Sequence, residues 1–172
     1  MGTTKTVIDT NVIISAFRWG GIPRQVFEQI TLDKSELIMS YEQLLEVEHT
    51  ARYPRLNLSP ADIEVLMEFI KITFTLVYIP KKLNVIKEDP SDNIILETAT
   101  DHNAEYVISG DKHLLKLKQY KNIKIVTPKE FLLKTGRIAQ DREGHAAWIW
   151  DPEGVKRYLA RKDLMWKPNH RR

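Results

Sequence analysis

Short apolar runs that end in polar residues alternate along this sequence with segments of helical spacing. The run Thr6–Ile8 stops at Asp9, and apolar residues at helical spacing follow from Val12 to Phe17. Later runs at 37–39, 76–79, 106–108 and 123–126 are likewise expected to be strands, with helices expected between them. Strands that alternate with helices favour right-handed crossovers. The predicted fold is therefore α/β, a three-layer α/β/α sandwich around a central parallel sheet.

Several helix boundaries can also be predicted. Ser40 is a suitable cap for a helix over 41–52, and Pro60 opens a helix whose apolar residues recur from Ile63 to Phe74. Asp89 and Pro90 are a suitable N-cap and first helical residue for a further helix. Two shorter helices are expected at 112–117 and 128–133.

Length and composition exclude several classes of protein. A chain of 172 residues has room for one domain of ordinary size. Because the chain has no cysteine, disulfide scaffolds, thiolate zinc sites, iron–sulfur clusters and cysteine nucleophiles are excluded. A metal ion would have to bind oxygen or imidazole. No apolar stretch approaches the roughly 18 residues of a membrane span, and we expect a cytoplasmic protein with no membrane contact.

The positive charge is concentrated towards the C-terminus. Residues 1–136 carry 17 basic and 18 acidic side chains, whereas residues 137–172 carry 9 and 5. We therefore expect a main domain over 1–136 and a basic extension over 137–172, which holds three of the four tryptophans. Within the main domain, residues 112–134 contain seven lysines and one acid. Such a run is either a solvated face or a surface that attracts phosphate.

Four carboxylates are expected at one edge of the predicted sheet. Asp9 closes the first strand, and Asp111 follows the strand 106–108. Glu46 lies in the second turn of the helix after the second strand, and Asp92 lies in the first turn of the helix after Pro90. In open parallel sheets the site lies outside the carboxyl ends of the strands. These four acids are therefore the candidate catalytic residues.

Each acid also has a purely structural interpretation. Asp9 and Asp111 are placed to cap helices, Asp92 is placed to complete a capping box with Asp89, and Glu46 is placed to be a solvated helix acid. Asp92, however, shares a stripe with Ile95, which points it inward. Asp92 is therefore favoured over Asp89 as the third acid, and the choice between them stays open.

Converging carboxylates repel one another unless a cation compensates their charge. Mg²⁺ or Mn²⁺ suits a site made only of oxygen ligands. One or two such ions activate water and hold the oxygens of a phosphodiester. The pattern thus points to metal-dependent cleavage of a polyanion.

The sequence resembles the PIN domain. The motifs that carry the resemblance are Val7–Val12, Ser40 with Glu46, the run Asp89-Pro90-Ser91-Asp92-Asn93, and Ile108–Lys112. The match covers residues 5 to 134, and it is similar to VapC-like prokaryotic PIN proteins that are classed as toxins of toxin–antitoxin pairs.

The resemblance implies a Mg²⁺- or Mn²⁺-dependent endoribonuclease. Its catalytic and metal-binding acids would be Asp9, Glu46, Asp92 and Asp111, and Asn11 and Ser109 would be supporting polar groups. Ser109 stands where members usually have threonine, which keeps the hydroxyl group. The resemblance also implies an RNA substrate, a cognate antitoxin protein and a homodimer.

The resemblance leaves several assignments open. Lys112, Lys116 and Lys118 are candidates for guiding the RNA strand. His49 and His113 are candidates for a role near the site, although capping and surface histidines are more common. The extension 137–172 suits RNA or partner binding, or packing against the main domain.

Other functions compete with the toxin nuclease. They are an RNA-processing nuclease that is not a toxin, and a non-catalytic RNA-binding or partner-binding module. A phosphatase that forms an aspartyl phosphate at Asp9 is disfavoured, because Asn11 stands where such enzymes usually have a second aspartate.

Overall fold

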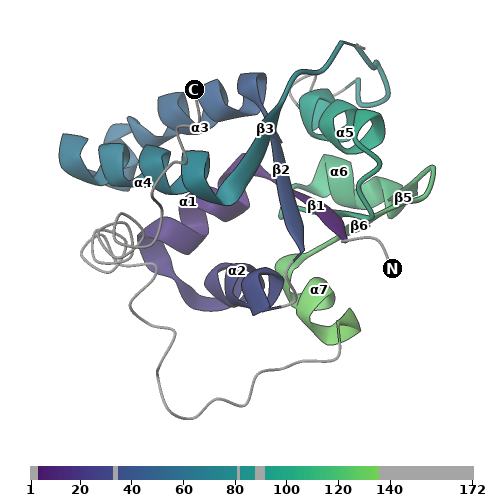
Figure 1. Cartoon of the computed structure of the whole chain (residues 1–172), viewed down its shortest axis with the longest axis horizontal. Helices are drawn as coiled ribbons and strands as arrows, with labels where there is room; N and C mark the ends of the chain where they lie inside the picture. The colour runs from purple at the N-terminus through teal and green to yellow at the C-terminus, as the bar shows by residue number, and fades with distance from the viewer. Residues whose placement is uncertain (1–3, 33–34, 81, 88–91, 136–172) are drawn as a thin grey trace, which may run out of the picture.

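A six-stranded sheet in the order β3-β2-β1-β4-β6-β5 runs through the molecule (Figure 1). It is seen in a computed structural model that describes residues 4–32, 35–80, 82–87 and 92–135. The strands are β1 (Lys5–Ile8), β2 (Glu36–Ser40), β3 (Phe74–Val77), β4 (Tyr106–Ile108), β5 (Gln119–Tyr120) and β6 (Ile123–Val126). All neighbouring strands are parallel except β5 and β6. The predicted α/β fold is confirmed, and the short edge strand β5 is an antiparallel addition to the expected sheet.

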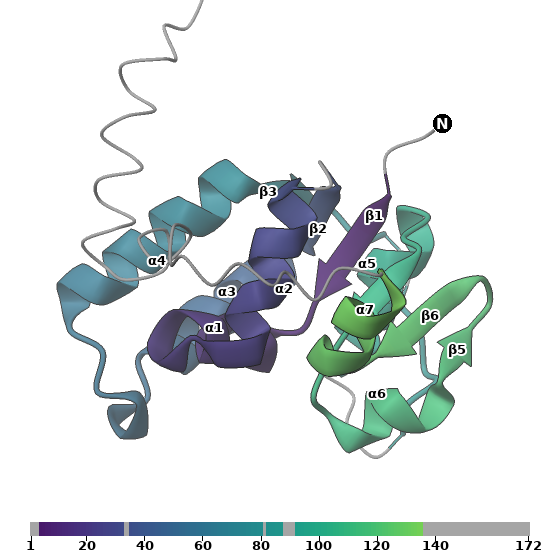
Figure 2. The same ribbon diagram turned by 90° about the horizontal axis from the view of Figure 1, so that it is seen from below.

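Helices cover both faces of the sheet (Figures 1 and 2). They are α1 (Thr10–Trp19), α2 (Gly21–Leu32), α3 (Tyr41–Ala51), α4 (Pro60–Thr73), α5 (Asp92–Asp101), α6 (Lys112–Leu117) and α7 (Pro128–Lys134). One core combines Ile8 and Ile108 of the strands with side chains of α1, α2, α3, α4 and α7. The other combines Val7 and Val107 with side chains of α5 and α6. Successive strand residues thus enter opposite cores, as the pleat of a sheet requires.

Polar caps fix where the helices begin. The Ser40 hydroxyl accepts a hydrogen bond from the Gln43 backbone N–H at 3.1 Å and starts α3, as predicted. Ser59 and Thr127 form complete capping boxes at α4 and α7. These caps satisfy N–H groups that have no partner within the helix.

The predicted boundaries are wrong where α4 meets β3, because the strand expected at 76–79 is formed by Phe74–Val77. The helical spacing from Ile63 continues to Phe74, but α4 ends at Thr73, and Phe74 pairs with Leu37 as the first residue of β3. Phe74 is buried as a strand residue, and a buried helix residue at this position would be equally apolar. The apolar pattern therefore does not distinguish the end of the helix from the start of the strand.

Two predictions lie outside the described residues, namely the extension 137–172 and the cap at Asp89. Within the residues that are described, no helix has the length and apolar character needed to cross a membrane.

Candidate active site

Polar residues stand in register at the carboxyl ends of the three central strands. Val7 pairs with Ile38 and Ile8 pairs with Ile108, so one register places Asp9 beside both Ser40 and Ser109. The Asp9 backbone N–H donates to the Ile108 carbonyl at 2.9 Å, which extends the ladder to this row. The edge predicted to hold the site is therefore lined by one carboxylate between two hydroxyl groups.

Asp9 is a helix cap and also a partner of the neighbouring strand. Its side chain is buried, with 5% of the residue exposed. Oδ1 accepts a 3.4 Å hydrogen bond from the Asn11 backbone N–H, and Oδ2 accepts a 2.5 Å bond from Ser109 Oγ. Asn11 thus supports Asp9 through its backbone, while its own side chain is exposed. The capping interpretation is correct, and it leaves the carboxylate at the sheet edge.

Ser109 connects Asp9 to Asp111. Its hydroxyl oxygen accepts a 2.9 Å hydrogen bond from the Asp111 backbone N–H while it donates to Asp9. Asp111 Oδ1 in turn accepts from the His113 backbone N–H at 2.6 Å and caps α6. One hydroxyl therefore links two of the four predicted acids, which come from strands 100 residues apart.

Glu46 reaches the same edge through a residue that sequence reasoning missed. Thr10, which is 1% exposed, donates from Oγ1 to Glu46 Oε2 at 3.0 Å. Gln43, also missed, donates from Nε2 to the Ile8 carbonyl at 2.6 Å and ties α3 to the end of β1. The available signals were a hydroxyl directly after Asp9 and an amide one turn before Glu46.

Asp92 is brought to this end of the sheet by the direction of α5. The loop after α5 lies at the opposite edge, where the Glu105 backbone N–H donates to the Lys5 carbonyl at 2.8 Å. A ten-residue helix spans about 15 Å, so its first turn lies towards the carboxyl ends of the strands. Asp92 is 8% exposed and shares the buried side of α5 with Ile95, as its stripe predicted. The alternative acid, Asp89, lies outside the described residues.

Two buried side chains of α5 hold the segment that precedes it. Asn93 Oδ1 accepts from the backbone N–H groups of Val85 at 3.0 Å and Ile86 at 2.9 Å. Asn93 Nδ2 also donates to the Ile86 carbonyl at 2.8 Å, and Glu97 accepts from the Leu83 backbone N–H. These contacts fix the orientation of the helix turn that carries Asp92.

The four predicted acids offer only oxygen atoms as metal ligands, which is the ligand type that a hard divalent cation prefers. In the part of the chain that the structure describes, no three histidine, aspartate or glutamate side chains stand close enough to share a metal ion as they are placed. The oxygens of Asp9, Glu46 and Asp111 instead accept hydrogen bonds from hydroxyl and backbone N–H groups. Binding of a cation therefore requires these side chains to turn towards a common centre.

The other predicted residues lie around this edge. Lys112, Lys116 and Lys118 are exposed on α6 and its C-terminus, immediately after Asp111. The backbone of His113 contacts Asp111, whereas His49 contacts the Tyr53 ring edge-on at the far end of α3. The structure thus brings the His113 backbone into contact with one of the predicted acids, whereas the contact it shows for the His49 ring is with Tyr53.

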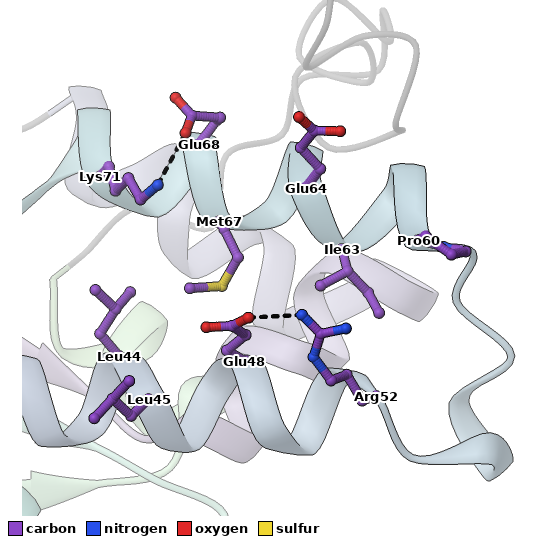
Figure 3. Close-up of a pocket in the computed structure, with 10 residues that line it drawn as sticks. All are labelled: Leu44, Leu45, Glu48, Arg52, Pro60, Ile63, Glu64, Met67, Glu68 and Lys71. Atoms are coloured by element: carbon purple, nitrogen blue, oxygen red, sulfur yellow. Dashed lines mark hydrogen bonds and ion pairs between the residues drawn. The ribbon is translucent and has the colours of Figure 1, made fainter.

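A groove of 410 Å³ between α3 and α4 contains none of the four acids (Figure 3). Its two basic side chains are both paired. Arg52 binds Glu48 at 2.7 Å, and Lys71 binds Glu68 at 3.0 Å. This groove is separate from the candidate site.

The comparisons with known proteins agree with the predicted fold. A search of curated proteins found no match to this chain. A family model described as the PIN domain matches residues 5–113, which is more than half of the chain and includes all four predicted acids. PIN domains are generally nucleases, a class of phosphodiester hydrolases. The chain therefore belongs to the PIN domain family.

Proposed function

We propose that this protein is a divalent-metal-dependent endoribonuclease that hydrolyses phosphodiester bonds of single-stranded or looped RNA. The observation that carries this proposal is the pair of hydroxyl links at one sheet edge. Ser109 joins Asp9 to the backbone of Asp111, and Thr10, the residue directly after Asp9, donates to Glu46. A row in which Asp9 and Asp92 are buried and Glu46 and Asp111 are half-buried costs stability unless a cation or hydrogen-bond donors compensate its charge.

The acids have distinct proposed roles. Asp9, Asp92 and Asp111 would ligate Mg²⁺ or Mn²⁺, and Glu46 would ligate it or orient the attacking water. When bound, the cation supplies positive charge to the phosphate oxygens and makes water more acidic. Ser109 and Thr10 hold the carboxylates of Asp9 and Glu46 at this edge, from where the side chains would turn towards a bound cation.

Basic side chains next to these acids suit a polyanionic substrate. Lys112, Lys116 and Lys118 are exposed, and no carboxylate of the described residues forms an ion pair with them. Cations that contact phosphates gain affinity by releasing condensed counterions. We propose that these lysines guide the RNA strand towards Asp111.

We further propose that the nuclease is the toxin of a toxin–antitoxin pair. The support is the likeness of its motifs to VapC-like proteins, which also implies a cognate antitoxin and a homodimer. Growth arrest on induced expression of the wild type, but not of Asp9→Asn, is the expected result. Cleavage in vitro without growth arrest would favour an RNA-processing nuclease.

Cleavage of a mixed-sequence labelled RNA tests the nuclease directly. We expect the wild type to cut with Mg²⁺ or Mn²⁺ and not with EDTA. Asp9→Asn and Glu46→Gln should both abolish cleavage without loss of the thermal unfolding transition. Glu42→Gln is the matched control, because Glu42 lies one turn before Glu46 on α3 and is exposed.

One outcome would contradict the nuclease proposal. If RNA is retained but never cut with either metal ion, the protein is a non-catalytic binding module. If Asp9→Asn unfolds, its carboxylate is mainly structural, and Glu46→Gln decides instead: a folded Glu46→Gln that still cuts RNA would contradict the catalytic assignment.

A further inference from the structure

A second groove, of 270 Å³, lies between α1 on one side and, on the other, the last turn of α3 with the short helical turn Pro54–Leu56 that follows it; it is called the groove between α1 and α3 below. The two helices pack against each other (Figure 2). The groove is lined by Asn11, Ile14, Ser15, Trp19, Thr50, Arg55 and Leu56. None of these seven side chains is acidic.

This groove begins at the acidic edge. The Thr10–Glu46 hydrogen bond joins the two helices at one end, and Arg18 Nε donates to the Leu56 carbonyl at 2.8 Å at the other. On α1, Asn11 and Trp19 lie eight residues apart on one face, which is a distance of about 12 Å. The groove therefore leads from the proposed cleavage site to an exposed tryptophan.

Two side chains at the far end have the chemistry of a nucleic-acid contact. Trp19 is 64% exposed, although tryptophan is usually largely buried. Arg55 lies over the Tyr53 ring, with its guanidinium carbon 5.5 Å from the ring centre. Among the described residues, no carboxylate lies within ion-pair distance of Arg55. Arg55 is thus available to an anion from outside the molecule.

The groove between α3 and α4 offers a direct contrast. It is lined by Glu48, Glu64 and Glu68, and both of its cations are already paired with glutamates (Figure 3). A polyanion would be repelled there. The groove between α1 and α3 instead presents hydroxyl groups, an amide and an arginine that forms no ion pair with any described residue, which favours an RNA strand over a protein helix as its occupant.

We propose that the groove between α1 and α3 is a subsite for single-stranded RNA on one side of the cleavage site, with Trp19 stacked on a base and Arg55 bound to a phosphate. This inference rests on the proposed RNA substrate. Base–aromatic stacking tolerates every base, because each has a π-face. α3 and α6 follow the strands on either side of β1, so this groove and the lysines of α6 flank Asp9.

The first test measures binding of a fluorescent single-stranded RNA by anisotropy. The full chain carries Asp9→Asn in every variant, so that the RNA stays intact. Adding Trp19→Ala should weaken binding about 5-fold to 100-fold, which corresponds to the loss of one stacked base. Trp19→Phe should retain most of the affinity. Tyr78→Ala is the control, because Tyr78 is 75% exposed but lies after β3, outside the groove.

The second test uses the salt dependence of the same binding. Arg55→Gln should lower the slope of log K against log salt by about 0.7, the value for one phosphate contact on a single strand. Arg52→Gln removes the same charge three residues away, where the arginine is already paired with Glu48. The slope measured for Arg52→Gln should equal that of the Asp9→Asn protein without a further substitution.

The outcomes separate this subsite from the proposed nuclease activity. If Trp19→Ala and Arg55→Gln bind RNA as their controls do, the subsite is refuted and the groove serves another occupant, such as a protein. If the protein with Asp9 intact cuts no RNA, yet binding still depends on Trp19, the subsite stands and the nuclease proposal fails. Absence of any RNA binding would overturn the subsite.

Discussion

The hydroxyl group of Ser109 connects two acidic residues, through the carboxylate of Asp9 and the backbone of Asp111. It donates to Asp9 and accepts from the Asp111 backbone, so its hydroxyl uses both of its hydrogen-bonding capacities in a fully buried position. A hydroxyl in such a place fixes the relative position of two chain segments. This role is compatible with the capping that Asp9 and Asp111 also perform.

Replacing Ser109 by alanine should therefore destabilise the protein. The change removes a donor from a buried carboxylate and an acceptor from a backbone N–H, and we expect a loss of about 1–3 kcal/mol. Urea unfolding measures this free energy. Ser109→Thr retains the hydroxyl and should stay within about 1 kcal/mol of the wild type. An unchanged unfolding midpoint for Ser109→Ala would show that the bridge contributes nothing.

Glu130 should make the start of α7 sensitive to acid. The backbone N–H of Thr127 donates to Oε2 at 2.8 Å, its hydroxyl donates at 2.9 Å, and these bonds lower the pKa of Glu130 from its ordinary 4.5. A lowered folded-state pKa gives stability that is present above pH 4.5 and lost as the pH falls through the folded value. Urea midpoints of Glu130→Gln should therefore approach those of the wild type as the pH falls below 4.5.

That convergence is the diagnostic result. A gap between Glu130→Gln and the wild type that stays constant from pH 7 to pH 3 would contradict it. Glu42→Gln, an exposed acid in the first turn of α3, is the appropriate control.

At the residue scale, the sequence places Asp9, Ser109 and Asp111 at the sheet edge, but it does not indicate Thr10 or Gln43. Asp9 and Asp111 directly follow strands, where a carboxylate is placed either to cap the next helix or to serve a site at the sheet edge. Thr10 and Gln43 are equally important to the geometry, but their contacts depend on how α3 lies against the end of β1. Only the packed structure contains that information.

Helix α3 is the element that carries Glu46 to the sheet edge. Its first turn is held by Ser40, its third residue is tied to β1, and its second turn contacts Thr10. Strand, cap and helix thus act as one unit. The orientation of Glu46 depends on where the helix begins.

Removal of the Ser40 cap should affect both stability and cleavage. Ser40→Ala frees the Gln43 backbone N–H and should cost about 1 kcal/mol. Ser59→Ala removes the equivalent cap from α4 and should cost a similar amount, with no effect on the position of Glu46. Unfolding and RNA cleavage are measured on both variants. Equal cleavage by the two would show that the start of α3 does not position Glu46.

Among the elements, those with strong local signals could be predicted. The central strands and the capped helices appear where their patterns place them, whereas the change from α4 to β3 at Phe74 does not. The two-residue strand β5 was missed as well. It is held by pairing of Tyr120 with Ile123, and a contact of that kind leaves no periodic pattern in so short a segment.

At the scale of the molecule, a core on each face holds the sheet, and the carboxyl ends of its strands form the edge that carries the predicted acids. The acids at that edge come from four separate elements, and a cation bound between them would cross-link all four. Ligand binding to the folded state alone raises the unfolding temperature by mass action.

Mn²⁺ should therefore stabilise the wild type against heat. At a concentration 100 times its dissociation constant the gain is about 2.7 kcal/mol. Thermal unfolding in EDTA and in Mn²⁺ measures the shift, which Asp92→Asn should reduce strongly and Glu42→Gln should leave intact. If Asp92→Asn keeps the full shift, Asp92 is not a ligand, and Asp89 becomes the candidate third acid.

The pairing of β1 with β4 has a consequence for synthesis of the protein. Thr6 lies beside Tyr106, and Asp9 is bridged to Ser109, a partner that is translated 100 residues later. Chains emerge from the ribosome N-terminus first, at about 5–20 residues per second. While residues 47–108 are being added, a nascent chain therefore has Asp9 and Glu46 but neither Ser109 nor Asp111. The proposed carboxylate site therefore cannot assemble before β4 and Asp111 have been synthesised, so the N-terminal half of the chain alone lacks it.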